Sequence, residues 1–352
     1  MNIGLGLYPN LLTDDNLRFA RQLGVTHIVT WMPLPPGNGL WELDDLVRLR
    51  SRIESFGLKL AAVENIPPSH WDKILLGDPG REQQVEKVKQ TIRNLGKAGI
   101  PCLGYTFSIV GVWGHWRDGE SGGGRGDAGI KSFDYDRVKD APPLVRGRIW
   151  GGHRWNDLAP EQVVGPVDVE TMWERLTWFL QEVVPVAEEA GVKLAAHPDD
   201  PPVPVLRGIG RLLTSPEALE RLTSIVDSPC NAIEFCQGTV AEMGADVVEV
   251  IRRLGSRKKI AYVHFRNVRG AVPSFDEVFI DEGNVDMMAA MRAYAEVGFD
   301  GVMIPDHTPK MSCAAPWHAG MAFAVGYMRA LEQKIGSTMT PHCGTSDETN
   351  RS

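Results

Sequence analysis

The feature that most constrains the fold of this 352-residue chain is a regular alternation of short apolar runs with longer amphipathic stretches. The short runs have strand length, and the apolar residues of the longer stretches recur at helical spacing. Strands alternating with helices predict a parallel sheet, and eight such pairs predict a (β/α)₈, or TIM, barrel. The predicted strands cover 2–8, 27–32, 59–65, 101–107, 192–197, 231–236, 260–265 and 301–305.

The predicted helices lie between and after these strands. An open doubly wound sheet is the alternative, but no GxGxxG motif follows an early strand. We therefore predict one barrel domain over 1–335, with a long insertion after the fourth strand (109–158) and a flexible C-terminal tail over 336–352. The tryptophans of the insertion favour an ordered lid. The predicted helices cover 13–23, 42–57, 82–98, 168–190, 215–225, 241–254, 286–296 and 318–333.

Composition excludes several classes of protein. The net charge of −8 argues against binding to nucleic acid or to an anionic membrane surface. No run of about 18 apolar residues predicts a transmembrane helix, and the first residues do not resemble a signal peptide. The five cysteines form no CxxC pair. We therefore expect no disulfide framework and a cytoplasmic location.

Metal-binding side chains stand at the ends of four consecutive predicted strands: His197, Cys236, His264 and Asp306. The carboxyl ends of TIM-barrel strands meet at one rim, where the active sites of such barrels lie. Imidazole, thiolate and carboxylate together suit a divalent first-row ion such as Mn²⁺, Fe²⁺, Co²⁺ or Zn²⁺. The sequence thus predicts a metal centre at this rim.

The segment that follows the first of these ligands is "HPDDPP", 197–202. Its prolines are expected to hold the loop of His197 rigid. Asp199 and Asp200 either orient a ligand or bind substrate hydroxyl groups. The other interpretation is that they only stabilise the turn.

Several segments resemble the mannonate dehydratase family of the hexuronate pathway. They are "VPVAEEAGVKLAAHPDDPP", "FCQGT", "VHFRNVRG", "SFDE" and "FDGVMIPDH", with "AAVENIPP", "KQTIRNLGKAGIPCLGYTF" and "FDYD" in the first half. The resemblance covers roughly 1–335 and extends in architecture to xylose isomerase-like barrels. It implies elimination of water from a sugar acid such as D-mannonate, giving a 2-keto-3-deoxy acid with Mn²⁺ or Fe²⁺. The family's metal ligands correspond to His197, Cys236, His264 and Asp306.

Such an elimination needs a base for the C2 proton and an acid for the C3 hydroxyl group. His307, beside Asp306, is the first candidate, and Glu64 at the end of the third strand is another that could instead bind hydroxyl groups. Arg266 is predicted to bind the substrate carboxylate, because a guanidinium can do so through two hydrogen bonds. Trp31, at the end of the second strand, is either a platform for the sugar or part of the core.

Two segments depart from the family. The position of the family's catalytic tyrosine falls near Ala319, so either His318 or Trp317 substitutes for it or the acid–base groups have changed. The loop after strand four reads "VWGHWRDG" where the family has an aspartate–tryptophan–threonine–arginine run. Here His115 and Arg117 are expected to recover part of that function in binding substrate.

These departures keep two other functions open. One is a metal-dependent isomerase or epimerase of the xylose isomerase-like type, and the other is a barrel that binds a sugar without turnover. The resemblance also suggests a homo-oligomer.

Overall fold

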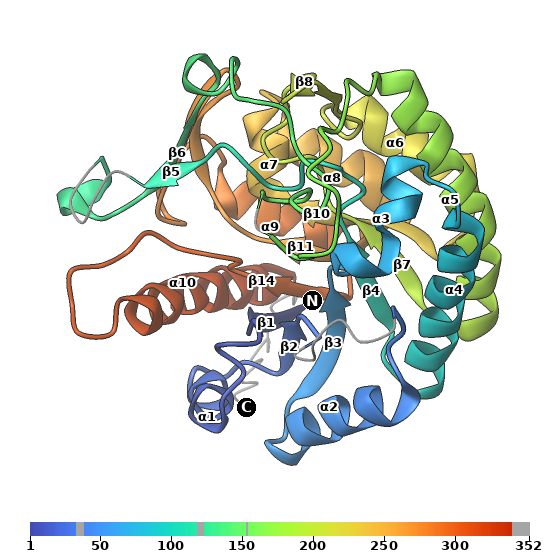
Figure 1. Ribbon diagram of the computed structural model, residues 1–352. Coiled ribbons are helices and arrows are strands. Elements are labelled where there is room, and N and C mark those ends of the chain that lie inside the picture. Colours follow the sequence, from blue (N-terminus) through green and yellow to red (C-terminus); the bar gives the residue numbers. More distant parts are fainter. Residues whose placement is uncertain (33–38, 118–122, 153, 340–352) are drawn as a thin grey trace, which may run out of the picture.

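Eight parallel strands close into a barrel in the computed structural model, which describes residues 1–32, 39–117, 123–152 and 154–339 (Figure 1). The TIM-barrel prediction is confirmed, and the open sheet is excluded by closure between the first and last strands. In order around the barrel, the strands are β1 (Asn2–Gly6), β14 (Val302–Ile304), β11 (Ile260–His264), β10 (Asn231–Cys236), β7 (Lys193–Ala196), β4 (Cys102–Tyr105), β3 (Lys59–Glu64) and β2 (His27–Thr30).

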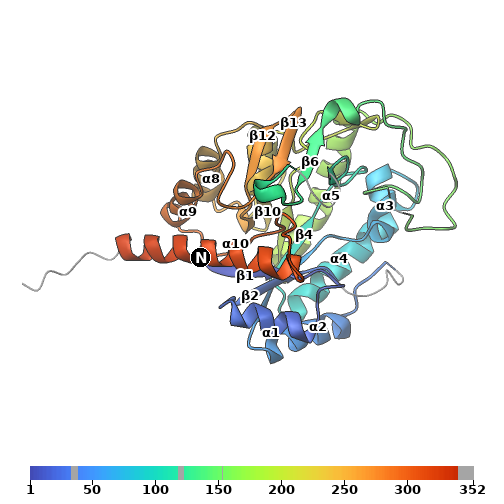
Figure 2. The same cartoon turned by 90° about the vertical axis from the view of Figure 1, so that its left-hand side faces the viewer.

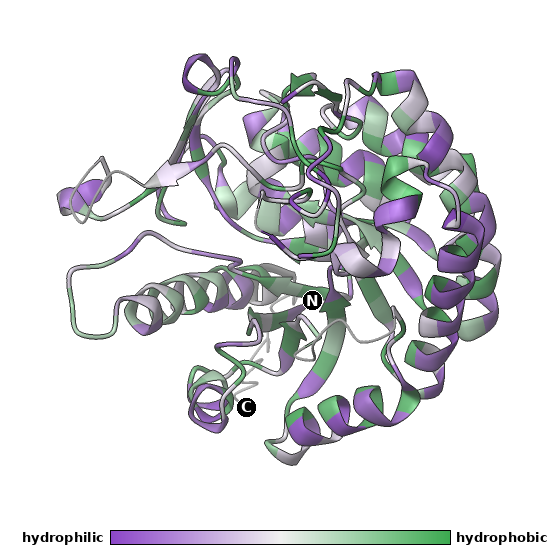
Figure 3. Ribbon diagram, in the orientation of Figure 1, coloured by the Kyte–Doolittle hydropathy of each residue, from purple (hydrophilic) through white to green (hydrophobic). Residues whose placement is uncertain are grey.

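Helices cover the outside of the barrel. They carry both hydrophilic and hydrophobic residues, as the colours of Figure 3 show. Their apolar sides pack on the strands, which are buried along most of their length. Among the described helices, none combines the length and apolar character needed to cross a membrane. The helices are α1 (Asp14–Gln22), α2 (Leu43–Ser55), α3 (Pro68–Leu76), α4 (Arg81–Lys97), α5 (Val169–Ala190), α6 (Pro216–Ile225), α7 (Gln237–Glu242), α8 (Val247–Ser256), α9 (Met287–Glu296) and α10 (Pro316–Met339).

The prediction of a single helix over 241–254 was wrong, because the chain forms two helices there, α7 and α8. Gly244 adopts a left-handed φ of 75° between them, a conformation that ends helices. The side chain of Asp246 then accepts a hydrogen bond from the backbone N–H of Glu249 and starts α8.

A second, four-stranded antiparallel sheet lies on the barrel on the side away from α1 and α2 (Figure 2). The insertion after β4 contributes β5 (Trp116–Arg117) and β6 (Lys131–Asp134), and the loop after β11 contributes β12 (Val268–Ala271) and β13 (Ser274–Glu277). The rings of Phe133 and Phe275 stack across this sheet, with 5.3 Å between their centroids. The insertion therefore includes ordered structure that is joined to a distant loop.

The remaining elements are short. A hairpin of β8 (Val205–Leu206) and β9 (Ile209–Gly210) follows β7, and 3₁₀ turns η1 (Arg125–Asp127) and η2 (Tyr135–Arg137) flank β6. Helix α10 continues to Met339, four residues into the predicted tail, and the rest of that tail lies outside the described residues. The domain limits drawn from the sequence stay a prediction.

Candidate metal centre

Three of the four predicted ligands meet at the carboxyl end of the barrel. His197, Cys236 and His264 each offer one ligand atom, and these atoms lie within 4.8 Å of one another. Two ligands on opposite sides of an ion, with bonds of about 2.1–2.3 Å, lie about 4.2–4.6 Å apart, so this spacing fits a metal. The carboxylate of Asp306 is the fourth, with Oδ2 3.6 Å from His264 Nδ1.

Burial and orientation also fit a cation. Nδ1 of His197 lies 2.6 Å from the carbonyl oxygen of Pro198, to which it can donate, and this leaves Nε2 for a metal. Both ring nitrogens of His264 are buried and lie against carboxylates, with Nε2 3.0 Å from Glu234 and Nδ1 3.6 Å from Asp306. Such a cluster of buried donors and acceptors is also the surrounding that a metal ion requires.

The charges of the cluster hold Cys236 as a thiolate, the form that binds a metal, and hold His197 protonated until a metal displaces the proton. Burial alone would raise the pKa of the Cys236 thiol, but the charge of Arg266 and the two neighbouring histidines hold it well below its usual value. Burial would lower the pKa of His197, but the charge of Glu234 and the thiolate raise it to about 10. The protein without metal therefore holds a thiolate beside protonated imidazole.

Glu234 is a site residue that the sequence analysis missed. Its carboxylate lies 3.0 Å from His264 Nε2, and burial followed by the charge of Glu64 raises its pKa to about 8. The available signal was its position two residues before Cys236 on β10, because alternate residues of a strand share a face. An acidic residue among the apolar residues of the "NAIEFC" strand needed a partner inside the barrel.

A cavity of about 750 Å³ opens over the ligands. It is large enough to hold a six-carbon sugar acid. Its walls combine the metal-ligand cluster with aromatic side chains from the barrel and from the insertion. The lining residues that bear on function are Tyr8, Trp31, Glu64, Lys131, Trp150, Trp155, His197, Asp200, His264, Asp306 and His307.

Trp31 and Glu64 both line this cavity and contact each other. The Trp31 indole donates a hydrogen bond to Glu64 Oε1 at 3.3 Å, while Glu64 Oε2 lies 3.4 Å from His264 Nε2. Trp31 also packs edge-on against Tyr8 and Trp150 at 5.3 and 6.0 Å. The structure thus brings both predicted residues to the metal-ligand cluster.

His307 lies on the same wall, between acidic and basic neighbours. Its Nδ1 is 3.0 Å from Glu277 Oε2, and its Nε2 is 3.2 Å from Asp306 Oδ2 and 3.1 Å from Lys131 Nζ. Asp306 adopts a left-handed φ of 65°, which is uncommon for a residue other than glycine and is frequent at functional sites. The tight turn after β14 therefore presents both side chains to the cavity.

Arg266 is buried and is surrounded by carboxylates of the protein. Its guanidinium lies 2.8 Å from Asp200, 2.8 Å from Glu242 and 3.3 Å from Asp306. These contacts occupy both terminal nitrogens and Nε, and the side chain is 3% exposed. The role of Arg266 in binding the substrate carboxylate stays a prediction. In the structure, its guanidinium is paired with carboxylates of the protein itself.

His115 joins this network and does not line the cavity. Its Nε2 lies 3.0 Å from Asp200 Oδ1, and its ring packs against Phe133 and Phe275 of the small sheet. His115, Asp200 and Glu277 also lie close enough together to bind a metal. Because the Arg266 guanidinium already contacts Asp200, we interpret this second group as an ion-pair network.

Two further predicted residues, Asp199 and His318, do not line the cavity either, and the role of Arg117 stays a prediction. Asp199 pairs with Arg211 at 3.0 Å and accepts hydrogen bonds from the backbone N–H groups of Leu212 and Leu213, which matches its alternative role in the turn. His318 lies 2.9 Å from Asn16 Oδ1, with its ring between Phe19 and Trp317. Arg117 lies in β5, and its side chain is outside the described part of the structure.

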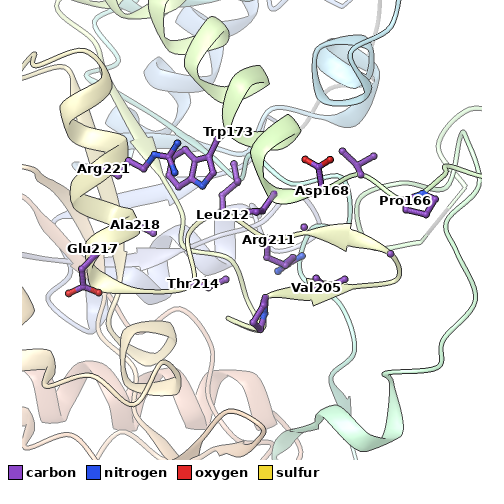
Figure 4. A pocket seen from close by; sticks show the side chains of 15 residues that line it. Pro166, Asp168, Trp173, Val205, Arg211, Leu212, Thr214, Glu217, Ala218 and Arg221 are labelled. Atoms are coloured by element: carbon purple, nitrogen blue, oxygen red, sulfur yellow. The ribbon is translucent and has the colours of Figure 1, made fainter.

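A second cavity of about 670 Å³ lies outside the barrel between α5, α6 and the β8–β9 hairpin (Figure 4). Arg221 covers the ring of Trp173 there at 4.0 Å, and Arg211 reaches its wall from the pair with Asp199. None of the predicted catalytic or metal-binding residues lines this second cavity. The predicted catalytic and metal-binding residues therefore point to the rim of the barrel rather than to this cavity.

The fold is a TIM barrel with candidate metal-binding groups at the carboxyl ends of its strands. The D-psicose 3-epimerase of Clostridium cellulolyticum shares the fold, with a TM-score of 0.61 and 14% identity over 94% of this chain and 99% of that chain. The mannonate dehydratase of Streptococcus suis serotype 2 is more similar, with a TM-score of 0.82 and 26% identity over 96% and 95%.

The profile of the D-mannonate dehydratase (UxuA) family matches residues 13–339. Mannonate dehydratase 2 of Halalkalibacterium halodurans is 34% identical over 302 residues, 83% of this chain and 86% of the relative. The mannonate dehydratase of Thermotoga maritima is 32% identical over 323 residues, 83% and 84% of the two chains. The chain therefore belongs to the mannonate dehydratase family, and the resemblance stated from its motifs is confirmed.

Proposed function

We propose that the protein removes water from D-mannonate to give a 2-keto-3-deoxy acid, with Mn²⁺ or Fe²⁺ bound by His197, Cys236, His264 and Asp306. Membership of the family makes it a hydro-lyase for a sugar acid. The observation that supports the ligand assignment is the meeting of histidine, thiolate and histidine within 4.8 Å beneath a cavity of sugar size. The 3-epimerases that share the fold are only 12–17% identical to this chain, so the isomerase alternative is not favoured.

The elimination itself requires two proton transfers: the C2 proton passes to a base, and the C3 hydroxyl group takes a proton and leaves as water. The resulting enol then takes a proton at C3 and releases its hydroxyl proton as it becomes the ketone. A bound divalent cation would stabilise the charge that develops next to the carboxylate. We assign the proton transfers to His307 and Glu64, because both line the cavity beside the metal-ligand cluster.

Other residues shape the site around these groups. Trp31 and its neighbours Tyr8 and Trp150 form an aromatic wall on which a sugar face can lie. Arg266 and His115 hold the acidic side chains of the rim in place through Asp200. The net charge of −8 supports a small-molecule substrate over nucleic acid. A cytoplasmic location and a homo-oligomer complete the proposal.

Turnover in D₂O tests the reaction. The protein loaded with Mn²⁺ is incubated with D-mannonate and related C5–C6 aldonates, and products are followed by NMR and mass spectrometry. We expect a 2-keto-3-deoxy product with deuterium at C3. Deuterium at carbon without loss of water would indicate an isomerase or epimerase, and ligand-dependent stabilisation without turnover would indicate a binding protein.

The assignment of His307 predicts a large loss of rate in His307→Gln. Positioned acid–base groups contribute about 10²–10⁴-fold, so we expect kcat to fall within that range while Mn²⁺ binding persists. His27→Gln is the matched control, because His27 begins β2 at the opposite end of the barrel. A His307→Gln protein with unchanged kcat would refute the role, and a comparable loss in His318→Gln would restore His318 as the predicted catalyst.

A further inference from the structure

We propose that Lys131, carried to the cavity by the small sheet, is a further substrate-binding residue that holds the carboxylate of the acid. The proposal rests on the proposed function for the identity of that acid. Among the cavity-lining side chains that the structure describes, Lys131 is the one lysine or arginine. Its Nζ lies 3.1 Å from His307 Nε2, beside the proposed site of proton transfer.

The charges around the two nearby cations distinguish their roles. Arg266 has four carboxylates within 4.0 Å, so its charge is already balanced by the protein. Lys131 has one described carboxylate, Glu277 at 3.5 Å, and shares it with His307 at 3.0 Å. Lys131 is 26% exposed, whereas Arg266 is 3% exposed. An additional anion in the cavity would therefore complete the charge balance at Lys131 and would compete with existing partners at Arg266.

The backbone holds Lys131 at this position from two sides. In the register of β6 and β13, Lys131 lies directly opposite Glu277. Two residues earlier, Gly129 exchanges two backbone hydrogen bonds with Lys310, at 3.0 and 2.7 Å. Lys310 follows His307 in the same loop, so the insertion and the His307 loop are fixed to each other. A fixed ammonium group is what orientation of a substrate anion requires.

The ammonium group also has the donors that this role needs. Lysine has three N–H donors. The observed contact at 3.1 Å with His307 Nε2 accounts for one of them, and Glu277 Oε2 at 3.5 Å is an ion-pair neighbour. A further donor can therefore be given to a carboxylate oxygen. This contact would place the carboxylate, and therefore the adjacent C2, within the region that His307 reaches.

A pair of unreactive ligands tests the charge contact directly. A 3-deoxyhexonate lacks the leaving hydroxyl group, and its amide lacks the negative charge. Both are titrated calorimetrically into Mn²⁺-loaded wild type, Lys131→Met, Lys131→Arg and Lys139→Met. Lys139 lies in the same insertion, is 47% exposed and pairs with Asp136, so it is the matched control. Thermal unfolding of each variant checks that the fold is retained.

We expect Lys131→Met to bind the acid about 10- to 100-fold more weakly, the value of a hydrogen bond between charged groups, and to bind the amide as the wild type does. Lys131→Arg should recover much of the loss, and Lys139→Met should show none. With D-mannonate, the loss should appear mainly in KM. Equal weakening of acid and amide, or a lower kcat with unchanged binding of the acid, would overturn the proposal in favour of a structural role.

The outcomes separate this proposal from the proposed function. If the wild type dehydrates D-mannonate but Lys131→Met binds acid and amide like the wild type, the dehydratase assignment stands and the lysine proposal fails. If the wild type does not dehydrate D-mannonate but its preference for the acid over the amide disappears in Lys131→Met, the lysine proposal stands and the substrate assignment fails. A wild type that binds both ligands equally would also overturn the lysine proposal.

Discussion

At the scale of single residues, the thiolate of Cys236 is the least replaceable part of the proposed metal centre. Serine has a hydroxyl group in place of the thiol. This group is not ionised at neutral pH and is a weaker ligand for first-row ions. We expect Cys236→Ser to lower Mn²⁺ or Zn²⁺ affinity by more than the 10- to 100-fold that loss of an outer partner of a ligand costs. Metal titrations followed by calorimetry measure the change.

The matched control for this substitution is Cys313→Ser. Cys313 is an exposed free cysteine, so its replacement should leave metal affinity unchanged. Retention of wild-type affinity in Cys236→Ser would show that the thiolate is not a ligand and that the metal lies elsewhere on the rim.

The raised pKa of His197 predicts a metal affinity that increases with pH. Its pKa of about 10 in the protein without metal lies above its ordinary value, so the protonated ring stabilises that state at neutral pH and this stabilisation is lost as pH rises through 10. A metal must displace the proton. We therefore expect affinity to rise about tenfold per pH unit for each proton released, between pH 6 and 8.

Calorimetry in buffers of different ionisation enthalpy counts the released protons. Cys236 should contribute none, because its pKa is held well below its usual value. Affinity independent of pH would mean that His197 is neutral before the metal arrives, and would contradict the charged pair described here.

Residues at strand ends could be predicted from the sequence because their positions follow from one rule, that TIM-barrel sites lie at the carboxyl ends of strands. This rule placed His197, Cys236 and His264 correctly at one rim. It could not place Lys131, because that side chain reaches the cavity through pairing between β6 and β13, about 140 positions apart in the chain. The ion pairs of Arg266 with acidic residues from several loops could not be predicted from the sequence for the same reason.

At the scale of elements, β4 shows how closely the barrel interior is fitted to the site. A Cβ atom added at Gly104 would lie 2.8 Å from Glu234 Oε2 and closer still to the hydroxyl group of Tyr262. We expect Gly104→Ala to destabilise the protein by about 1–3 kcal/mol, the usual effect of overpacking a core. Because Glu234 flanks His264, metal affinity should fall as well.

Gly326→Ala in α10 is the control, because a Cβ at Gly326 meets nothing within 4 Å. Alanine stabilises a helix by roughly 1 kcal/mol relative to glycine, so this variant should unfold at an equal or higher denaturant concentration. Chemical denaturation of both variants, with and without Mn²⁺, separates the two effects. Unchanged stability in Gly104→Ala would mean that Tyr262 and Glu234 can move aside freely.

The elements divide into those that local patterning predicts and those that it does not. Each barrel strand is a compact apolar run, and the alternation of such runs with helical patterns could be recognised in the sequence. The four-residue strands of the small sheet are short and polar, and they pair across the insertion and the loop after β11. Such pairings are non-local, and no periodicity within either segment encodes them.

At the scale of the whole molecule, metal binding and stability should be linked, because the proposed ligands come from the ends of β10 and β11 and from the loops after β7 and β14. A ligand that binds only the folded state stabilises it by about 2.7 kcal/mol at 100 times Kd. For a chain of this length, that free energy corresponds to a rise in Tm of about 4 °C. Differential scanning fluorimetry with Mn²⁺, and after removal of metal by a chelator, measures this shift.

The size of the shift should depend on the metal and on the ligands. Mg²⁺ prefers oxygen ligands, so it should stabilise the protein less than Mn²⁺ at equal concentration. Cys236→Ser should lose most of the Mn²⁺-dependent rise, and Cys313→Ser should keep it. The four proposed ligands come from four neighbouring strands of the barrel or from the loops that follow them. If Mn²⁺ did not change the Tm of the wild type, a metal centre that joins these strands would be contradicted.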